Sequence, residues 1–277
     1  MLNCHLGSRV WRESVVSLVA VAALAAGFVP TSATAQVPSG TLIQTCNDGG
    51  EWPPYFYYDR VNGEKTDDIL GFDIDVFNEI FTSRGYEYTF ELIAWSRCLL
   101  EVEKGEDYFM VSSVAYSKER DEKYLITEPY YTVQPHYFYH YANFPNGLEI
   151  SSLADFSNYN VCGLRGYNYT NFGIPVEDID TGTRIFSQLI EKTRRNRCDI
   201  FLGRFEIFSG FARTGNDYIR DNNLGTAPMP GVAGDKFYMM VSRNYQYAEE
   251  LREMINDGIN RLKSTGLDQT MIAPYLQ

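Results

Sequence analysis

The spacing of apolar residues between positions 41 and 111 switches between the two-residue period of a strand and the 3.6-residue period of a helix. Residues 86–93, for example, alternate and are rich in Tyr, Phe and Thr, which is typical of a strand. The predicted elements follow the order β-α-β-α-β and occupy residues 41–46, 71–85, 86–93, 95–102 and 108–111. This order predicts an α/β fold in which a parallel sheet carries helices on both faces.

A similar order returns in the second half of the chain. Residues 133–141 form an aromatic stretch without a helical period, which predicts a strand that crosses between two units. The further predicted elements are strands at 160–164 and 199–203, a helix at 181–196 with Ile185, Leu189 and Ile190 facing inward, a strand at 237–241 that could cross back, and helices at 247–262 and 267–275. The chain therefore predicts two α/β lobes of similar order.

Residues 111–120 carry the most informative polar pattern of the chain. A buried strand is expected to end in Ser112 and Ser113, and a helix start with Ser117 and Arg120 follows. Hydroxyls, free backbone N–H groups at a helix start and a guanidinium can together bind a carboxylate. The alternative interpretation is a serine N-cap followed by a surface arginine, which is a common arrangement.

Polar or aromatic clusters follow three of the predicted strands, at residues 48–55, at Trp95 and at residues 112–120. Ligands of open parallel sheets bind outside the carboxyl ends of the strands. These clusters therefore predict one shared site, which favours the carboxylate interpretation over the simple cap. Asp73 and Asp75, at the start of the first helix, are interpreted as its cap and a first-turn acid.

Residues 1–35 have the pattern of a secretory signal peptide. Arg9 and Arg12 precede a small apolar stretch at residues 15–29, and Ala33-Thr34-Ala35 forms an A-x-A cleavage site. The apolar stretch is short for a membrane span, and no later segment qualifies. We therefore expect a protein that crosses the inner membrane, is cleaved near Ala35 and resides in the periplasm.

The formal net charge of the chain is −12. Such an acidic protein is a poor candidate for binding nucleic acid or an anionic membrane, so we expect no nucleic-acid partner. The total charge does not decide what a local pocket binds, because a basic pocket can lie within an acidic protein.

Four cysteines follow the predicted cleavage site, namely Cys46, Cys98, Cys162 and Cys198. An even number in an exported protein predicts disulfides, of which three pairings are possible, and the absence of C-x-x-C spacing disfavours zinc. His136 and His140 would lie roughly 13 Å apart on a strand, too far to share a metal ion. We therefore expect no metal and no other cofactor.

Several landmarks occur in an order and spacing that together resemble a known family: Gly71–Asp75, Gly105–Asp107, Ser112-Ser113 through Glu119-Arg120, and Glu128–Tyr130. Over residues 42–275 the chain resembles the periplasmic solute-binding proteins of the polar amino-acid type, family 3. The resemblance implies a two-lobed, type II periplasmic-binding-protein-like fold in which each lobe has a mainly parallel sheet flanked by helices. Two crossing strands join the lobes, which close on the ligand. It places residues 36–135 plus 238–277 in lobe 1 and residues 136–237 in lobe 2.

The resemblance also implies a set of ligand-binding residues. Arg120 would hold a carboxylate of the ligand, helped by donors from Ser112, Ser113 and the turn that contains Tyr167 and Asn168. Three aromatic residues would line the rest of the pocket, namely Trp52, Tyr55 and Trp95.

One position departs from the family pattern. Amino-acid binders commonly have a second aspartate five residues after the aspartate that opens the corresponding strand of lobe 2, and it holds the ligand ammonium. Here that strand opens at Asp199 and the position is Arg204, which cannot hold an ammonium. Glu206 or Asp48 could replace it; otherwise the ligand could carry a second anionic group. The alternative is that Arg204 is a solvent-facing arginine at a helix start.

The two-lobed arrangement implied by the resemblance also bears on the disulfides. Cys46 and Cys98 would lie in lobe 1, whereas Cys162 and Cys198 would lie in lobe 2. A bridge between the lobes would oppose opening of the hinge. The pairing expected is therefore Cys46–Cys98 and Cys162–Cys198.

By this resemblance the protein captures a small, polar, carboxylate-bearing solute, such as an amino acid, for an ABC importer. We expect it to act as a monomer that contacts a transporter permease or a membrane receptor. A first alternative is an exported, dehydratase-like enzyme with Glu206 or Glu51 as a general acid or base. No paired acid–base arrangement is visible, so we expect no catalytic residues. A second alternative is a ligand sensor for a membrane receptor, which the sequence does not separate from a transport protein.

Overall fold

Strand β1 (Leu42–Asp48) lies inside the first sheet of the computed structural model, which describes residues 1–2 and 36–276. It pairs in parallel with β4 on one side and β5 on the other, as the β-α-β-α-β order predicts. The sheet has the order β4-β1-β5-β13-β6, and β7 also pairs with β13. Its other strands are β4 (Glu87–Ile93), β5 (Met110–Ala115), β6 (Tyr124–Ile126), β7 (Tyr131–Val133) and β13 (Asp235–Ser242).

The second sheet has the strand order β10-β9-β11-β8-β12. Its strands are β8 (Pro135–His140), β9 (Val161–Leu164), β10 (Ile179–Thr183), β11 (Ile200–Arg204) and β12 (Leu224–Pro228). Strand β9 is parallel to β10 and β11, whereas β8 is antiparallel to β11 and β12. In the first sheet, β13 is likewise antiparallel to its neighbours. Each sheet is therefore mixed, with its antiparallel part next to the segments that cross between the sheets.

The chain crosses between the two sheets twice, and the two crossings lie side by side. On the outward path β7 ends at Val133 in the first sheet, and β8 begins at Pro135 in the second. On the return path β12 ends at Pro228, and β13 begins at Asp235. Val133 and Asp235 are direct partners in the antiparallel pair of β7 and β13. The type II two-lobed fold with two crossing strands is thus present, whereas the exact lobe boundaries stay a prediction.

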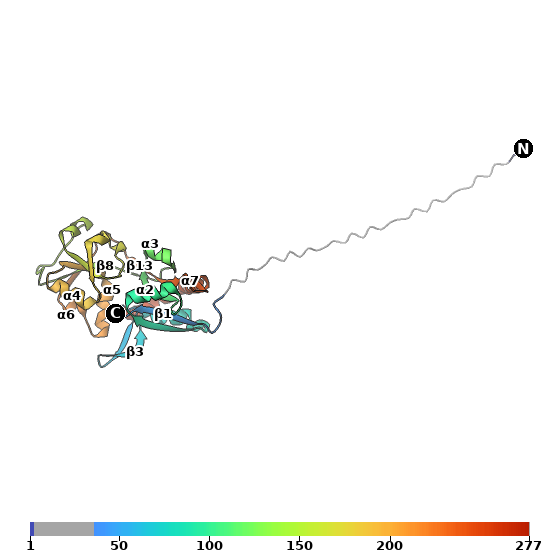
Figure 1. Ribbon diagram of the computed structural model, residues 1–277, viewed down its shortest axis with the longest axis horizontal. Helices are drawn as coiled ribbons and strands as arrows, with labels where there is room; N and C mark the ends of the chain where they lie inside the picture. Colours follow the sequence, from blue (N-terminus) through green and yellow to red (C-terminus); the bar gives the residue numbers. More distant parts are fainter. Residues whose placement is uncertain (3–35, 277) are drawn as a thin grey trace. The chain divides into compact units, whose positions relative to one another are not determined.

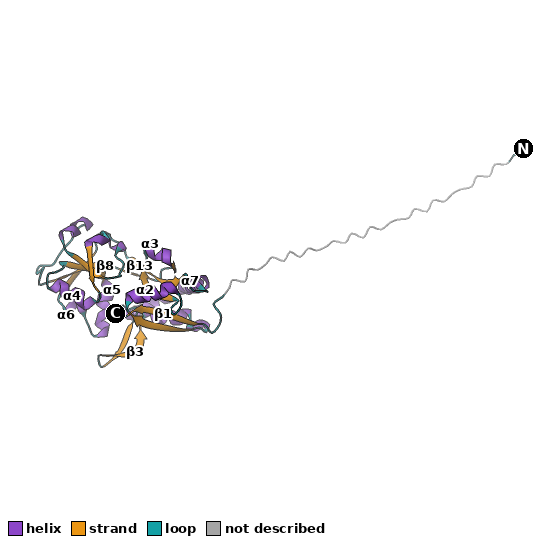
Figure 2. Cartoon of the chain, viewed as in Figure 1, coloured by secondary structure: helices purple, strands orange, loops and turns teal. Residues whose placement is uncertain are grey.

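Helices flank both sheets, and in Figure 1 β1, α2 and α7 lie together while β8, α4 and α6 gather around the second sheet. The helices are α1 (Phe72–Ile80), α2 (Trp95–Lys104), α3 (Lys118–Lys123), α4 (Phe186–Arg194), α5 (Phe205–Gly210), α6 (Tyr218–Asp221), α7 (Ala248–Thr265) and α8 (Leu267–Ile272). Figure 2 shows these helices against the strands, together with a hairpin of β2 (Tyr57–Val61) and β3 (Glu64–Leu70) that extends from the first sheet.

Three local predictions are wrong. Asp73 does not cap α1, because Gly71 occupies the cap position and the Asp73 side chain is completely buried. The strand does not end at Ser112 and Ser113, because β5 continues to Ala115. Ile185 is 47% exposed, because residues 179–183 form a strand and α4 begins only at Phe186. Each error arises because tertiary contacts override a local pattern.

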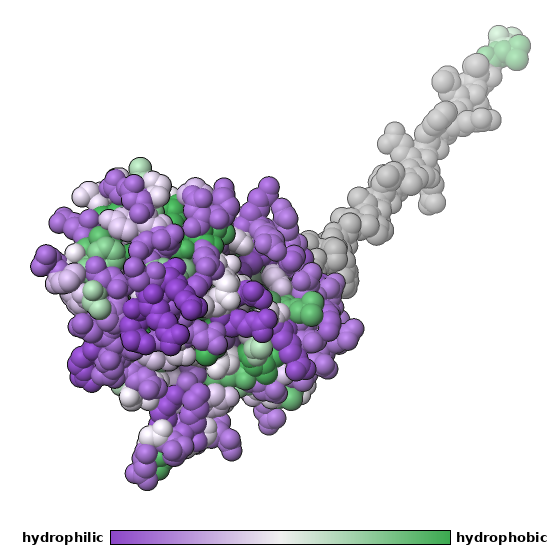
Figure 3. All heavy atoms as spheres, turned by 60° about the vertical axis from the view of Figure 1, so that its left-hand side comes forward, coloured by the Kyte–Doolittle hydropathy of each residue, from purple (hydrophilic) through white to green (hydrophobic). Residues whose placement is uncertain are grey.

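Both predicted disulfides, Cys46–Cys98 and Cys162–Cys198, are present. The first joins β1 to α2 and the second links β9 to the residues before β11, so each stays beside one sheet. The predicted signal peptide, residues 1–35, lies outside the described residues except for its first two. None of the helices in the described part has the length and apolar character needed to cross a membrane. The face drawn in Figure 3 is largely hydrophilic, with small and separate apolar areas.

Candidate functional site

A cavity lies where the carboxyl ends of β1 and β5 face the turn after β9 and the end of β11. Its volume is about 30 Å³, well below the roughly 300–1,000 Å³ typical of ligand sites, because the groups that line it contact one another. Its lining residues are Asn47, Asp48, Trp52, Phe56, Trp95, Ser113, Ala115, Arg120, Tyr167, Asn168, Arg204 and Phe237. The expected convergence of strand ends therefore produces a cavity, which the second sheet closes from the other side.

Arg120 supplies the positive charge on the first-sheet side of this cavity. Ser117 caps α3 by accepting a hydrogen bond from the Arg120 backbone N–H, and the Arg120 guanidinium donates to the Ala115 carbonyl oxygen at 2.8 Å. The guanidinium also lies 5.7 Å from the Trp95 ring centre. Among the described residues, no carboxylate forms an ion pair with it. Burial and the charge of Arg204 lower the pKa of Arg120 to about 10, so the site favours an added anion.

Of the two predicted serines, Ser113 lines the cavity and Ser112 does not. Both hydroxyls donate to the same oxygen of Asp73, at 2.6 Å for Ser112 and 2.8 Å for Ser113, and the Tyr130 hydroxyl donates to its other oxygen. Ser113 has a φ of 56°, at an irregularity in the pairing of β5 with β13. Such a left-handed conformation is unusual for a serine and is retained here by the surrounding contacts.

The carboxylate of Asp73 therefore organises the polar core next to the cavity. Burial raises its pKa to about 7, although hydrogen bonds from Ser112, Ser113 and Tyr130 oppose the shift. Ser113 also accepts a hydrogen bond from the Tyr131 hydroxyl at 2.7 Å, and Tyr131 accepts one from the Trp52 indole N–H at 3.1 Å. This chain of hydrogen bonds links the cavity wall to Asp73.

Asp48 is the acid that lines the cavity, at the last position of β1. It accepts hydrogen bonds from the Tyr167 hydroxyl and from the backbone N–H of Gly50. Burial raises its pKa, while these two hydrogen bonds oppose the shift. The Tyr167 hydrogen bond joins the end of a first-sheet strand to a turn of the second lobe.

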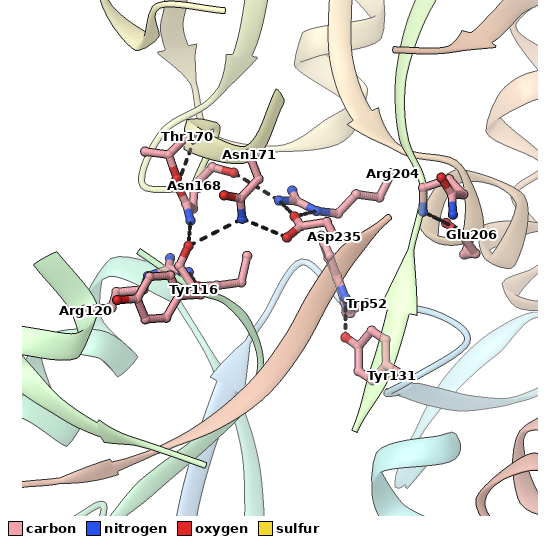
Figure 4. Close-up of polar contacts among 12 residues, drawn as sticks. Trp52, Tyr116, Arg120, Tyr131, Asn168, Thr170, Asn171, Arg204, Glu206 and Asp235 are labelled. Atoms are coloured by element: carbon pink, nitrogen blue, oxygen red, sulfur yellow. Dashed lines mark hydrogen bonds and ion pairs between the residues drawn. The ribbon is translucent and has the colours of Figure 1, made fainter. Parts of the chain in front are cut away.

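Further hydrogen bonds join the two sides of the cavity. The Trp95 indole donates to the Gly166 carbonyl at 3.1 Å, and the Asn168 amide donates to the Tyr116 carbonyl at 2.6 Å. Figure 4 shows Asn168 and Asn171 both directed toward Tyr116, next to Arg120. The groups that line the cavity are thus largely in contact with one another.

The aromatic residues expected around the ligand separate into two groups. Trp52 and Trp95 line the cavity, where Trp52 lies edge-on to Tyr167 with ring centres 5.6 Å apart. Tyr55 does not line it, because its ring stacks on Tyr131 at 3.7 Å and lines a second hollow. We therefore assign Trp52 and Trp95 to the candidate site and Tyr55 to the packing behind it.

Arg204 lines the cavity but is not solvent-facing, since only 3% of it is exposed. Its guanidinium donates from two nitrogens to one oxygen of Asp235, at 2.6 and 3.1 Å, and also to the Asn168 carbonyl. Two phenylalanine rings lie next to the guanidinium, whose carbon is 5.0 Å from the ring centre of Phe172 and 5.1 Å from that of Phe237. Asp235 therefore balances the charge of Arg204 within the protein (Figure 4).

Glu206 lies away from the cavity, and Figure 4 shows it at the opposite end of the view from Arg120. Its carboxylate accepts from the backbone N–H of Gln134 at 2.9 and 3.1 Å, beside the outward crossing. It lines the second hollow together with Tyr55. Of the two acids proposed as an ammonium partner, the structure thus brings only Asp48 to the cavity.

Sequence reasoning missed several lining residues, among them Asn47 and Phe237, and it missed Asp235, the partner of Arg204. The rule that ligands meet strand ends could have identified Asn47, because it precedes Asp48 in β1. No local pattern could have identified Asp235, because its contact with Arg204 spans 31 positions.

Comparison with known proteins gives the family. The model of the bacterial extracellular solute-binding proteins, family 3, matches residues 45–277. Among curated protein sequences, none matches this chain.

Solved structures share the fold. The Streptococcus pneumoniae substrate-binding protein of an amino acid ABC transporter, bound to L-arginine, has a TM-score of 0.65 at 19% identity and covers 86% of this chain and 94% of its own. A histidine kinase sensor domain similar to periplasmic binding proteins has a TM-score of 0.64 at 19% identity, and the match covers 86% of this chain and 96% of that domain. An ancestral amino-acid-binding protein, a precursor of cyclohexadienyl dehydratase, has a TM-score of 0.64 at 16% identity, and the match covers 85% of this chain and 96% of that protein. The sequence match and this shared fold agree, and the chain belongs to the bacterial extracellular solute-binding proteins, family 3.

Proposed function

We propose that this solute-binding protein captures a small carboxylate-bearing solute, an amino acid or a related acid, in the cavity lined by Arg120, and delivers it to an ABC importer. The observation that carries the proposal is the guanidinium of Arg120, which lines the cavity without a carboxylate partner among the described residues. A ligand carboxylate would complete this charge, since a guanidinium can hold both carboxylate oxygens.

The other lining groups support an amphipathic solute of modest size. Trp52, Trp95 and Tyr167 offer ring faces and edges for an apolar part, and Ser113 and Asn168 add polar groups at the cavity wall. Asp48 could accept from an ammonium, and an amino-acid ligand agrees with the arginine bound to the Streptococcus pneumoniae protein of similar fold. In this proposal Arg204 supports the cavity wall through Asp235, and no second anionic group is required.

The proposal places the mature protein in the periplasm, as a monomer that contacts a transporter permease and needs no cofactor. Binding is favoured over catalysis because Asp48 is the one carboxylate among the residues that line the cavity, whereas Glu206 and Glu51 do not line it. Glu51 is instead paired with Arg60 and Lys65. Acid–base chemistry with two carboxylates would need a second one at the same place. The absence of turnover of prephenate-like acids would agree with this assignment.

The test is a thermal-shift and calorimetric screen of the mature protein against amino acids, organic acids and polyamines. A ligand at 100 times its Kd should raise the free energy of unfolding by about 2.7 kcal/mol. Arg120→Gln should then weaken binding by about 2–5 kcal/mol. The control is Arg97→Gln, which removes a surface arginine whose side chain is 72% exposed. Unchanged binding by Arg120→Gln would overturn the proposal.

A further inference from the structure

The second hollow lies behind the two crossings, outside the site described above. Its volume is about 450 Å³, against about 30 Å³ for the cavity. Its walls are the crossing segments at Thr132 and Lys236, helix α5 at Glu206, and helix α8 at Gln269 and Ile272. Charged side chains of both signs line it, so its chemistry does not select one kind of ligand. Its place behind the crossings is the more informative feature.

The cavity and the second hollow lie on opposite faces of the return crossing. Lys236 and Phe237 are consecutive residues of β13, and consecutive side chains of a strand point to opposite faces. Phe237 lines the cavity, whereas Lys236 lines the second hollow together with Thr132, its direct partner in β7. The crossings therefore separate the two spaces.

A solute cannot enter the cavity unless its two sides move apart. The cavity is too small for an amino acid, and the hydrogen bond from Trp95 to Gly166 is one of those that close it. The segments that join the two sheets are short, residues 133–135 and 228–235, so the two sides move apart by bending of these segments. Because the second hollow lies behind the segments that bend, it must narrow as the cavity widens.

Glu206 is the part of the second hollow that moves with the second sheet. It lies in α5, directly after β11, and its carboxylate accepts from the Gln134 backbone N–H at 2.9 and 3.1 Å. The Phe205 N–H donates to the Gln134 carbonyl at 3.1 Å. Helix α5 thus holds both backbone groups of Gln134, so bending of the outward crossing falls before this residue. When the second hollow narrows, Glu206 therefore approaches the wall formed by α8.

We propose that the second hollow controls the affinity for the solute, because a side chain that fills it opposes opening of the lobes and favours the closed form that holds the solute. This inference rests on the proposed function, since it assumes that a solute is held between the closed lobes. Residues of β7 and α8 that line the second hollow are then positioning residues, which act on the affinity without touching the solute. The apparent Kd falls in proportion as the form that holds the solute becomes more populated.

The test is Gln269→Trp, which places a large ring at an exposed position of α8 that lines the second hollow. Calorimetry of the mature protein with the tightest-binding acid of the screen should give a Kd about fivefold to a hundredfold lower than that of the parent. Small-angle X-ray scattering without solute should give a smaller radius of gyration than that of the parent. Thr132→Trp, on the wall formed by the outward crossing, should have the same two effects.

Thr270 offers a matched control on the same helix. It is exposed and follows Gln269, but it does not line the second hollow. Thr270→Trp should change the Kd by less than about twofold and leave the radius of gyration unchanged. Urea unfolding shows whether each variant folds, and tyrosine replaces tryptophan at a position where the variant does not fold.

The possible results separate the two proposals. If neither Gln269→Trp nor Thr132→Trp tightens binding, or if Thr270→Trp tightens it equally, the role of the second hollow is overturned. An unchanged radius of gyration in Gln269→Trp and Thr132→Trp overturns it as well, and this measurement needs no solute. If no carboxylate of the screen binds, or if Arg120→Gln binds as well as the parent, the proposed function itself fails.

Discussion

The buried pair of Arg204 and Asp235 gives a prediction whose size can be worked from the structure. Their side chains are 3% and 2% exposed, and the guanidinium makes two hydrogen bonds to one Asp235 oxygen. Asp235→Leu would leave the guanidinium with the Asn168 carbonyl as its remaining hydrogen-bond acceptor among the described residues. Breaking such a pair by removing one charge typically costs about 3–5 kcal/mol, because the other charge stays buried.

Removing both charges should cost far less than removing either one. In Arg204→Met with Asp235→Leu, no buried charge is left, and the new side chains can pack against Phe172 and Phe237. Replacing a buried ion pair by apolar residues is often neutral or slightly stabilising. We therefore expect the double variant to lie within about 2 kcal/mol of the parent, although each single variant loses about 3–5 kcal/mol.

The assay is urea unfolding of the parent, both single variants and the double variant, followed by tryptophan fluorescence and by circular dichroism. Coincident transitions would justify the free energies that enter the double-mutant cycle. Glu191→Gln is the control, because it breaks a surface ion pair with Arg194 and should not measurably change stability. If the two single losses simply add in the double variant, the charges are not coupled as the contacts indicate, and the structural role of Arg204 would be refuted.

Three more outcomes are expected. The pKa of Asp73 is raised from 3.8 to about 7, so the folded state binds its proton more tightly than the unfolded state does. The free energy of unfolding should therefore fall by up to about 4 kcal/mol as the pH rises from 4 to 7. Asp73→Asn should remove this slope in urea titrations at several pH values; an unchanged slope would contradict the assignment. Gly71→Ala should destabilise the protein by at least about 2 kcal/mol, because φ is 130° and the added Cβ would lie 2.2 Å from the Tyr55 carbonyl oxygen. Gly85→Ala is the control, because nothing lies within 4 Å of the added Cβ, and its left-handed backbone should cost only about 1–2 kcal/mol of stability. Equal losses of stability in Gly71→Ala and Gly85→Ala would contradict the steric explanation. Replacing Cys162 and Cys198 by serine should lower the free energy of unfolding by about 3–4 kcal/mol, because the disulfide closes a loop across 36 positions. Thermal or urea unfolding under oxidising conditions measures this loss. An unchanged stability would show that the disulfide does not constrain the unfolded chain.

Much of the fold followed from local patterns. Local patterns predicted the parallel strands β4, β1 and β5, helix α2 and the helix start at Ser117, because hydrophobic period and capping chemistry act over a few residues. The two disulfide pairings followed once the family resemblance divided the cysteines between two lobes. The hairpin strand β3 was missed because residues 64–70 are mostly exposed and carry few apolar side chains.

The candidate site was predicted only as far as the ends of strands are readable. The strand-end rule predicted that Asp48, Trp52, Trp95, Ser113 and Arg120 meet, and the family resemblance added Tyr167, Asn168 and Arg204. All of these residues line one cavity. Their individual roles as ligand-binding residues stay predictions. Ser112, Tyr55 and Glu206 lie behind or beside the cavity, because the direction of a side chain depends on neighbours that are distant in sequence.

The sequence by itself determined the family, the two-lobed α/β architecture and the presence of an arginine at a strand-to-helix junction, because these depend on local periodicity and short motifs. Only the tertiary structure decided which charges are already balanced inside the protein. It paired Arg204 with Asp235, surrounded Asp73 with three hydroxyl donors and left Arg120 without a carboxylate partner among the described residues. The physical reason is that a buried charge must be compensated by whichever groups the fold brings within hydrogen-bonding distance, and that distance is set by packing and not by spacing along the chain.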